Sequence, residues 1–456
     1  MTHRNLEEAL QSAGNAVEML RNSQIGPYAF PVVRHEFTNW RDEQRAWKET
    51  CALFDQSHHM TDLYVEGPDA SKLLSELAVN SFKNFKVNTA KQFVATNHRG
   101  YVIGDAILFY LAENKFNLVG RPPAANWVQF NAETRKYNVK CERDERSAQN
   151  DGRRRTFRYQ LQGPNALKAM QKILGKPVPE VRFFAMDLFR IGGFDVRALR
   201  HGMVGQPGWE LFGPWDQGDA VRDAIVEAGQ EFGIRQVGAR TYPTSCLESG
   251  WIPSPLPAIY TGDEMKAYRQ WLTGKSYEAM ASLGGSFVSR NIEDYYLTPY
   301  DLGYGPFVKF DHDFPGRAEL EKVSANPPRE KVTLLWNGDD VARAFKTMSD
   351  DGDITKYIDT PLANYATLPY DRVMKSGKVA GLSTYTGYTY NERSWLSLGI
   401  VNKEHAAPGT EVTIVWGEEG RGTTKPTVER HKQAEIRATV APVPISEVAR
   451  VAYRPK

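Results

Sequence analysis

Two segments of the chain repeat one order of hydrophobic and polar positions. In Leu63–Leu77 and in Tyr159–Leu174, a short alternation of apolar and polar residues meets a Gly-Pro pair and then continues as an apolar run with helical spacing. Alternation predicts a half-buried strand, and a proline directly after the turn suits the start of a helix. The sequence therefore predicts two related strand–turn–helix units.

The segment between these units has the pattern of an antiparallel hairpin. Tyr101–Tyr110 and Phe116–Val119 are apolar runs separated by the polar turn Ala112–Lys115, and Asn97–Gly100 is a turn signal before the first run. Short apolar runs bounded by such turn residues are typical of paired strands. We therefore expect a hairpin here.

Two further segments lack a regular pattern. Residues 144–155 are highly charged and are interpreted as an exposed loop. Residues 262–285 are irregular apart from a helix-like stretch at 264–272, and they are interpreted as an insertion beside the binding site.

The pattern changes near residue 330 to short β-rich runs between turns, at 332–336, 378–383, 396–401 and 412–416. Runs with this spacing favour a small antiparallel barrel. The tail beyond Gly420 holds one more strand candidate, Glu435–Val440, and is expected to end loosely ordered. The prediction is an α+β fold with two related, interleaved α/β domains in residues 1–330 and a β-barrel with an extended tail in residues 331–456.

Composition narrows the function classes. Of 456 residues, 41% are hydrophobic and 25% are charged, which is typical of a soluble globular protein. The formal net charge of +2 predicts no nucleic-acid or anionic-membrane partner and permits a monomer. No apolar run approaches the roughly 20 residues that span a bilayer, and the acidic N-terminus lacks a signal core.

Cysteine placement and motif searches exclude several chemistries. Cys51, Cys141 and Cys246 lie far apart without metal-ligand spacing, so no metal site is predicted. A reduced, cytoplasmic setting fits these cysteines. The sequence has no Ser/His/Asp order, phosphate-binding loop or dinucleotide fingerprint.

Six elements in the same order resemble the landmarks of the aminomethyltransferase-like family, which includes the glycine cleavage T-protein. They are Phe54–Met60, Arg99–Asp105, Leu161–Pro164, Gly205–Leu211, Ala239–Trp251, and Thr298–Gly303 followed by Asp313–Arg317. The resemblance implies a three-domain ring in which two related α/β units and a C-terminal antiparallel β-barrel enclose a central channel for tetrahydrofolate.

The resemblance also implies contacts to tetrahydrofolate. Glu210 is the expected pterin anchor, because a carboxylate accepts two adjacent N–H donors in a bidentate way; a satisfied strand carboxylate is the alternative. Trp251 holds the family's folate-contacting position, with core packing as its alternative. The other cofactor-binding candidates are Gln92, Val119, Gln160, Asp105 and Arg240, of which Val119 fits ordinary core equally well.

The chain departs from the glycine cleavage enzyme where that enzyme performs amine chemistry. The family strand carries two adjacent acids, whereas this chain has Gly104 followed by Asp105. In the family's reaction the missing acid helps to position folate for attack on an aminomethyl group. Lysine-rich docking features for a lipoyl carrier are not evident either, so the glycine cleavage reaction is disfavoured.

Other departures resemble the tetrahydrofolate-dependent aryl-ether O-demethylases, which act on methoxybenzoates such as vanillate and 3-O-methylgallate. They are the doubled His58-His59, Arg121 at a strand end, Tyr242 in a lengthened loop, and the long extension after Gly420. The sequence does not choose between the two kinds of ring, since a single ring hydroxyl separates them.

The chemistry of such a reaction suggests roles for these residues. An enzyme must align N5 of tetrahydrofolate, the methyl group and the ether oxygen, and must stabilise the charge on the departing oxygen. Tyr242 is the candidate donor to that oxygen, because a phenol is nearly matched in pKa to a phenol leaving group. His59 is expected to orient Tyr242 or to bind the neighbouring ring hydroxyl.

The remaining substrate-binding candidates are Arg121, Tyr28, His58 and Gln56. Arg121 is expected to pair with the aromatic carboxylate or with the folate glutamate, since a guanidinium fork fits carboxylates. Tyr28 is a candidate channel aromatic. One of His58 and His59 is expected to be structural.

Two other functions stay open on the sequence. The same scaffold fits demethylation of a sulfonium or amine, whose better leaving groups need no proton donor. It also fits a non-catalytic folate-binding regulator.

Overall fold

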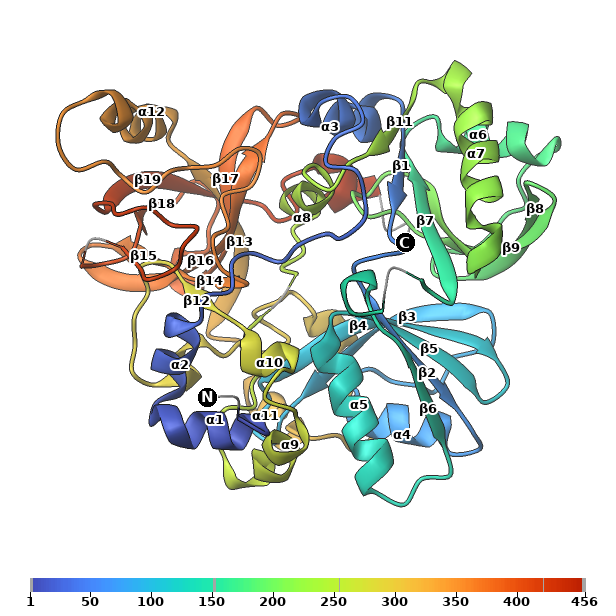
Figure 1. Ribbon diagram of the computed structural model, residues 1–456, viewed down its shortest axis with the longest axis horizontal. Helices are drawn as coiled ribbons and strands as arrows, with labels where there is room; N and C mark the ends of the chain where they lie inside the picture. The colour runs from blue at the N-terminus through green and yellow to red at the C-terminus, as the bar shows by residue number, and fades with distance from the viewer. Residues whose placement is uncertain (1–2, 151–152, 254, 421, 453–456) are drawn as a thin grey trace.

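The computed structural model describes residues 3–150, 153–253, 255–420 and 422–452. Figure 1 shows two β-sheets and a β-barrel arranged around the middle of the molecule, with helices on their outer sides. Within the described ranges, none of the helices has the length and apolar character that crossing a lipid bilayer requires.

The first sheet has five antiparallel strands in the order β3-β4-β5-β2-β6. Their bounds are Thr61–Glu66 (β2), Thr89–Thr96 (β3), Val102–Ala112 (β4), Lys115–Gly120 (β5) and Lys140–Asp144 (β6). Helices α4 (Ala70–Leu77) and α5 (Pro122–Thr134) cover one face. The predicted hairpin is confirmed as β4–β5, which turns at Glu113-Asn114.

The second sheet has six strands in the order β11-β1-β7-β10-β9-β8, and only the β1–β11 pair is parallel. The bounds are Cys51–Asp55 (β1), Thr156–Gln162 (β7), Met186–Ile191 (β8), Phe194–Arg200 (β9), Gly208–Pro214 (β10) and Ile234–Val237 (β11). Helices α3 (Trp40–Glu49), α6 (Ala166–Leu174) and α7 (Gly218–Gly229) pack on it. Since β2–β6 form the other sheet, the chain leaves this sheet after β1 and returns at β7.

The predicted internal repeat is confirmed as β2–α4 and β7–α6. Both turns place a glycine in a backbone conformation that other residues rarely adopt, with φ of 137° at Gly67 and 131° at Gly163. A Cβ at Gly163 would lie 2.6 Å from the carbonyl oxygen of Thr50. The glycine is therefore required both by the turn and by the close approach of the neighbouring strand.

The predicted C-terminal barrel is confirmed as a closed structure of six antiparallel strands in the order β13-β17-β16-β15-β18-β19. The strands are β13 (Arg329–Trp336), β15 (Asp371–Lys375), β16 (Lys378–Thr389), β17 (Ser394–Asn402), β18 (Glu411–Trp416) and β19 (Ala434–Ala441). Helix α12 (Gly338–Lys346) packs beside β19. The last strand matches the candidate predicted in the tail.

Shorter elements connect the three β-structures. They are α1 (Leu6–Ala13), α2 (Ala16–Asn22), α8 (Ser245–Ser249), α9 (Lys266–Trp271), α10 (Tyr277–Met280), α11 (Arg317–Val323), and the strand pair β12 (Leu283–Gly284) and β14 (Leu368–Pro369). The insertion at 262–285 packs α9 against α1, and Asn5 bridges to Thr273.

The prediction of an exposed loop at 144–155 is wrong for part of the segment, in which residues 151 and 152 lie outside the described residues. Asp144, Ser147 and Arg154 are buried, and the segment includes a short 3-10 helix at Ser147–Gln149. Arg154 donates to Asp62 at 2.6 Å and lies 3.1 Å from Asp144, so its charge is compensated within the protein. Some charged residues of this segment therefore form buried ion pairs, and others lie on the surface.

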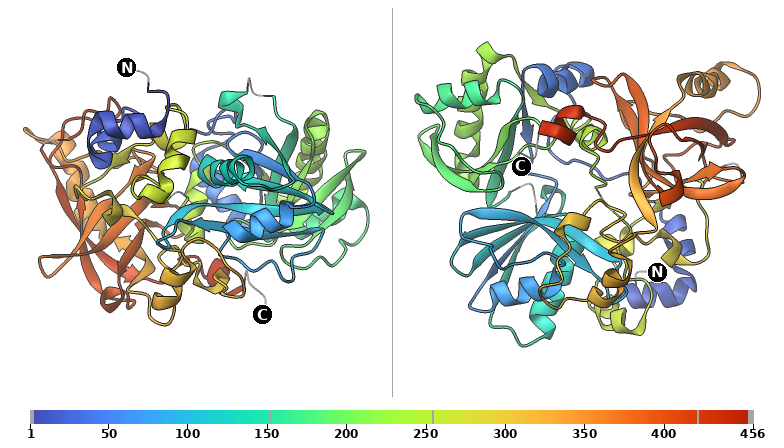
Figure 2. Two further views of the ribbon diagram at one scale, coloured as in Figure 1. Left: turned by 90° about the horizontal axis from the view of Figure 1, so that it is seen from below. Right: turned by 180° about the vertical axis from the view of Figure 1, so that it is seen from behind.

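The prediction of a loosely ordered end is also wrong for the described part of the tail. After β19 the chain crosses to the second sheet and forms a short π-helix at Val448–Ala452, as the view from behind in Figure 2 shows. Ala449 is buried, and a Cβ at Gly205 would lie 2.2 Å from its Cα atom. The tail thus joins the barrel to the loop before β10.

Candidate active site

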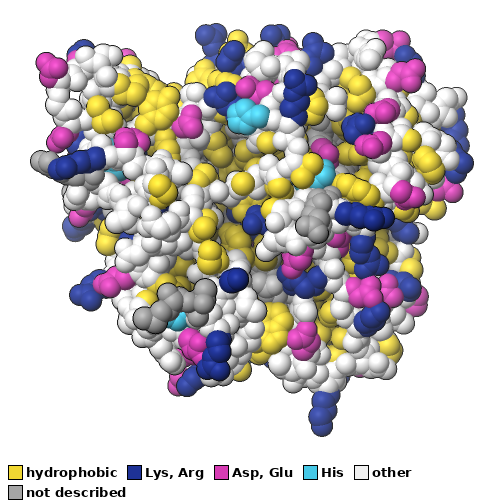
Figure 3. Space-filling view, in the orientation of Figure 1, with side chains coloured by type: hydrophobic (Ala, Val, Ile, Leu, Met, Phe, Trp, Pro, Cys, Tyr) yellow, Lys and Arg dark blue, Asp and Glu magenta, His cyan; other side chains and the backbone are white. Residues whose placement is uncertain are grey.

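A cavity of about 750 Å³ lies where the two sheets and the barrel meet. Its walls come from β3, β4 and β5, from the loop before β10, from residues 242–253 and 302–309, and from Lys331 and Tyr385 of the barrel. Figure 3 shows the molecular surface hollowed near its centre, with hydrophobic side chains inside the hollow. The volume lies within the range of small-molecule and cofactor sites.

Tyr242 lines this cavity from a 3-10 helix, Tyr242–Thr244, that runs directly into α8. The lengthened loop predicted here is therefore helical. The Tyr242 ring packs against Phe30, Phe54 and His59, at centroid distances of 4.9, 5.5 and 4.7 Å. Gln56 donates from Nε2 to the Tyr242 hydroxyl at 3.2 Å. Burial raises the pKa of Tyr242, so the phenol keeps its proton.

The structure separates the roles of the two adjacent histidines. His59 lines the cavity, and its Nδ1 has no hydrogen-bond partner among the described residues. Burial, reinforced by the charge of Arg121, lowers the pKa of His59 to about 3. His58 points elsewhere and is satisfied, with Nδ1 2.8 Å from Ser147 Oγ and Nε2 3.5 Å from Asp55. His58 is thus the structural histidine, and its predicted substrate contact is not supported by this geometry.

The lowered pKa of His59 predicts a pH-dependent stability. The folded protein leaves this imidazole neutral down to about pH 3, whereas the unfolded chain protonates it below its ordinary value near 6.5. The free energy of unfolding therefore decreases as the pH falls below about 6.5, and at pH 5 it is lower by about 2 kcal/mol. Urea unfolding at pH 7.5 and 5.0 should show a smaller acid-induced loss for His59→Gln than for the wild type; equal losses would contradict this role.

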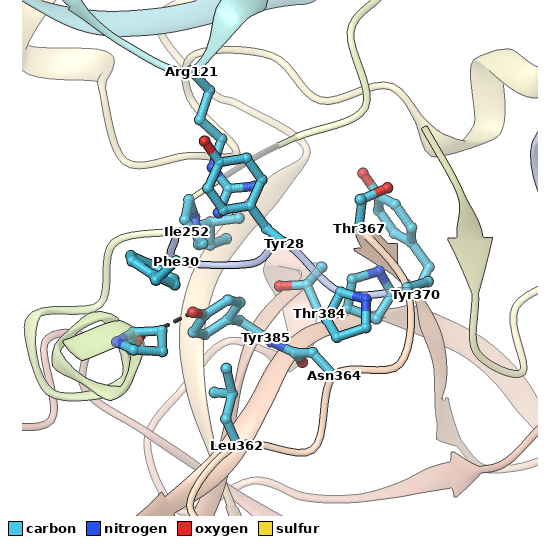
Figure 4. A pocket seen from close by; sticks show the side chains of 15 residues that line it. Tyr28, Phe30, Arg121, Ile252, Leu362, Asn364, Thr367, Tyr370, Thr384 and Tyr385 are labelled. Atoms are coloured by element: carbon cyan, nitrogen blue, oxygen red, sulfur yellow. Dashed lines mark hydrogen bonds between the residues drawn. The ribbon is translucent and has the colours of Figure 1, made fainter. Parts of the chain in front are cut away.

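Arg121 lines this cavity, whereas Tyr28 lies just outside its lining; Figure 4 shows both side chains at a smaller neighbouring pocket. The guanidinium of Arg121 lies 4.1 Å from the centre of the Tyr28 ring, and Tyr28 donates its hydroxyl hydrogen bond to the backbone carbonyl of His59. Arg121 precedes α5, whose first residues are Pro122 and Pro123. Within the described residues no carboxylate forms an ion pair with Arg121. Although burial lowers the pKa of Arg121, the neighbouring phenols raise it overall, so the charge is retained.

At another wall of the cavity one carboxylate gathers three donors. Asp105 Oδ2 accepts from the Tyr304 hydroxyl at 2.7 Å, from Gln92 Nε2 at 2.8 Å and from Trp251 Nε1 at 3.3 Å. Trp251 also donates to the Tyr304 hydroxyl at 2.8 Å, and its ring is 40% exposed. Burial raises the pKa of Asp105 despite these donors. The four side chains therefore form one polar group on an otherwise apolar wall.

The missing acid at Gly104 has a structural reason. A Cβ at this position would lie 2.7 Å from the backbone nitrogen of Ala124 and 3.1 Å from Pro123 Cβ. Any side chain here would collide with the start of α5. The departure at Gly104 and the prolines after Arg121 therefore belong to one local arrangement.

Glu210 lines the cavity from β10 and is 5% exposed. One of its oxygens pairs with Arg158 on β7, whose other guanidinium nitrogen lies 3.1 Å from Asp62 on β2. Burial raises the pKa of Glu210, while Arg158 opposes this effect. The carboxylate is thus held at the junction of the two sheets.

The structure brings most of the predicted cofactor residues to the cavity but leaves two outside its lining. Val119 lies in the wall and is 3% exposed. Gln160 instead donates to the carbonyl oxygen of His201 at 2.8 Å. Arg240 pairs with Glu36 at 3.3 Å and donates to the carbonyl oxygen of Thr360 at 2.8 Å. For Gln160 and Arg240 the geometry indicates structural roles.

Sequence reasoning missed Tyr304, Arg158 and Tyr385. Arg158 carried a usable signal, because this arginine directly precedes the strand predicted from Tyr159 onward. Tyr304 lies in the bridge to the barrel, and only the fold brings it to Asp105. Tyr385 lies on β16 and donates to the carbonyl oxygen of Pro243 at 3.1 Å, which supports the turn that carries Tyr242.

Comparison with known proteins gives the family. The family model described as the GCVT N-terminal domain matches residues 9–254. A syringate O-demethylase from Sphingobium sp. strain SYK-6 is 51% identical over 99% of this chain and 98% of its own length. A sesamin methylene transferase from Sinomonas sp. strain No.22 is 30% identical over 91% of each chain.

One solved structure supports the fold. The glycine cleavage aminomethyltransferase T of Bartonella henselae aligns with a TM-score of 0.59 at 19% identity, covering 96% of this chain and 97% of its own. The three-part architecture and the predicted fold class are thereby confirmed. The chain therefore belongs to the aminomethyltransferase-like family and is one of its tetrahydrofolate-dependent one-carbon transferases.

Proposed function

We propose that the protein is an O-demethylase that transfers the methyl group of a methoxybenzoate to N5 of tetrahydrofolate, giving a phenolic acid and 5-methyltetrahydrofolate. One observation carries the proposal: the buried Tyr242 phenol and the Arg121 guanidinium line the same cavity. Arg121 has no ion-pair partner among the described residues. The similarity to a syringate O-demethylase supports the same substrate class. The substrate is an acid of the vanillate, 3-O-methylgallate or syringate type.

Arg121 would bind the carboxylate of such an acid. A half-buried cation without a compensating carboxylate is costly, and a carboxylate fits the guanidinium fork with two parallel hydrogen bonds. The nearby start of α5 adds a partial positive charge.

Other parts of the cavity lining have the polar groups that a folate head group needs. Glu210 offers carboxylate oxygens to adjacent N–H donors, and Asp105 with Gln92 and Trp251 offers a second polar group above an apolar wall that includes Val119. The volume and these donors and acceptors fit a folate. When bound, tetrahydrofolate supplies the nucleophilic nitrogen that accepts the methyl group.

Tyr242 would stabilise the oxygen that the methyl group leaves. The methyl–oxygen bond breaks as the nitrogen–methyl bond forms, and the proton that N5 loses balances the proton that the phenolic product gains. Tyr242 donates to the departing oxygen, and its raised pKa keeps the donor protonated before the reaction. His59 Nδ1 and Gln56 Oε1 lack partners among the described residues, and they can bind the adjacent ring hydroxyl.

The proposal is tested by incubating the protein with tetrahydrofolate and syringate, vanillate or 3-O-methylgallate, while following 5-methyltetrahydrofolate by chromatography. Stoichiometric loss of the methoxy group and gain of 5-methyltetrahydrofolate is the expected result. Folate binding without transfer from any of these acids would instead indicate a regulator, and transfer only from a sulfonium or amine would indicate the other enzyme class.

Replacing Arg121 by glutamine is expected to raise KM for the methoxybenzoate by about 10–100-fold, because a hydrogen-bonded charge pair is lost. The matched measurement uses 2-methoxyphenol, which has the ether and hydroxyl but no carboxylate. Its kcat/KM should change far less. An equal decrease of kcat/KM for both compounds would show that Arg121 binds folate or stabilises the fold and does not bind the substrate carboxylate.

A further inference from the structure

A second cavity, of about 760 Å³, adjoins the first on the side of α5 and α10. Its walls come from residues 25–29, from α5, from residues 143–149 and from residues 271–281. Tyr277 lines both cavities, Tyr28 lines the second, and Arg121 lines the first. The partition between the two cavities is therefore built from these three side chains.

Two guanidinium groups contact the ring of Tyr28. Arg121 is 4.1 Å from the ring centre and Arg146 is 5.0 Å from it. Arg121 belongs to the wall of the first cavity and Arg146 to the wall of the second. The ring also packs against Phe30, and its hydroxyl donates to the backbone carbonyl of His59.

The second cavity carries positive charge beside this ring. Its two acids are outnumbered by Arg143, Arg146 and Lys275. Glu145 pairs with Arg143 at 2.7 Å, and Glu133 accepts hydrogen bonds from Trp271 Nε1 at 2.8 Å and from Gln129 Nε2 at 2.7 Å. Arg146 forms no ion pair with any described carboxylate. Lys275 is exposed at the same cavity.

We propose that the second cavity is an outer binding site for the aromatic carboxylate substrate, with Arg146 as its anion-binding side chain and Tyr28 as the partition to the reaction cavity. The inference rests on the proposed function. A hydroxylated benzoate has a ring of the same kind as the Tyr28 phenol that both guanidinium groups contact. Such an acid can first bind at Arg146 and then move inward, so that its carboxylate binds Arg121 instead.

Arg146→Gln should lower kcat/KM for vanillate or syringate about tenfold at low ionic strength, with kcat unchanged, because a charged entry site raises capture rather than chemistry. The loss should shrink as salt is added. Arg146→Lys, which keeps the charge, should restore most of the capture rate. Arg135→Gln removes the same charge from an exposed position outside both cavities and is the matched control.

The comparison compound is again 2-methoxyphenol, for which Arg146→Gln should have little effect. An equal loss for this neutral ether, or no loss for the acids, would overturn the outer site. If the protein demethylates no aryl ether at all, the proposed function is wrong. The outer site can then still be tested by measuring benzoate binding by calorimetry. Weaker benzoate binding in Arg146→Gln than in Arg135→Gln supports it, and equal binding refutes it.

Discussion

Tyr242→Phe is expected to lower kcat for a methoxybenzoate by about 10²–10³-fold, with little change in folate affinity. The phenylalanine ring retains the packing against Phe30, Phe54 and His59, so the fold around it is preserved. Only the hydroxyl is lost, and Gln56 is left without that acceptor. The departing oxygen then has no phenol donor from this position.

The measurement combines single-turnover rates with tetrahydrofolate binding by calorimetry. Tyr385→Phe is the comparison variant, because it removes a hydroxyl that lines the same cavity and only supports the turn of Tyr242 through the backbone of Pro243; its loss of kcat should be much smaller. An ether with an electron-withdrawing ring substituent should be less sensitive to Tyr242→Phe, since its oxygen leaves with less assistance. Retained turnover in Tyr242→Phe would remove the tyrosine from the chemistry and favour a substrate with a better leaving group.

The parts of the fold that follow from local pattern were predictable from the sequence. The two strand–turn–helix units, the β4–β5 hairpin and the barrel strands depend on alternation, on turn residues and on glycines such as Gly67 and Gly163 that no other residue replaces easily. Tyr242, Arg121 and His59 were predictable as candidates because they depart from a family pattern. That these three residues line one cavity could not be predicted from the family pattern.

The rest depended on contacts between distant segments. Asp105 and Tyr304 are 199 positions apart, and only the bridge to the barrel brings them together. Arg154 was assigned to an exposed loop because its segment is charged, yet it compensates Asp62 in the interior. Charge alone does not distinguish a solvated residue from a buried partner, since the partner lies on another strand.

Arg158→Met is expected to destabilise the protein by about 3–5 kcal/mol, because the remaining partners would keep buried charge without compensation. Arg158 connects Glu210 on β10 with Asp62 on β2, and its side chain is 2% exposed. In this variant Asp62 still has Arg154 and Asn117 as partners. The carboxylate left without a compensating charge is therefore mainly that of Glu210. Arg190→Met, which breaks an exposed pair with Asp195, should cost less than about 1 kcal/mol.

Urea unfolding of Arg158→Met, Glu210→Gln and the double variant separates the two roles of Glu210. If the glutamate serves the fold through Arg158, the double variant should recover part of the stability that Arg158→Met loses, because the uncompensated carboxylate is gone. If it also binds the pterin, Glu210→Gln should weaken tetrahydrofolate binding more than it lowers stability. Unchanged folate affinity in a folded Glu210→Gln protein would leave Glu210 with its structural role alone, and the Asp105 group would become the principal folate contact.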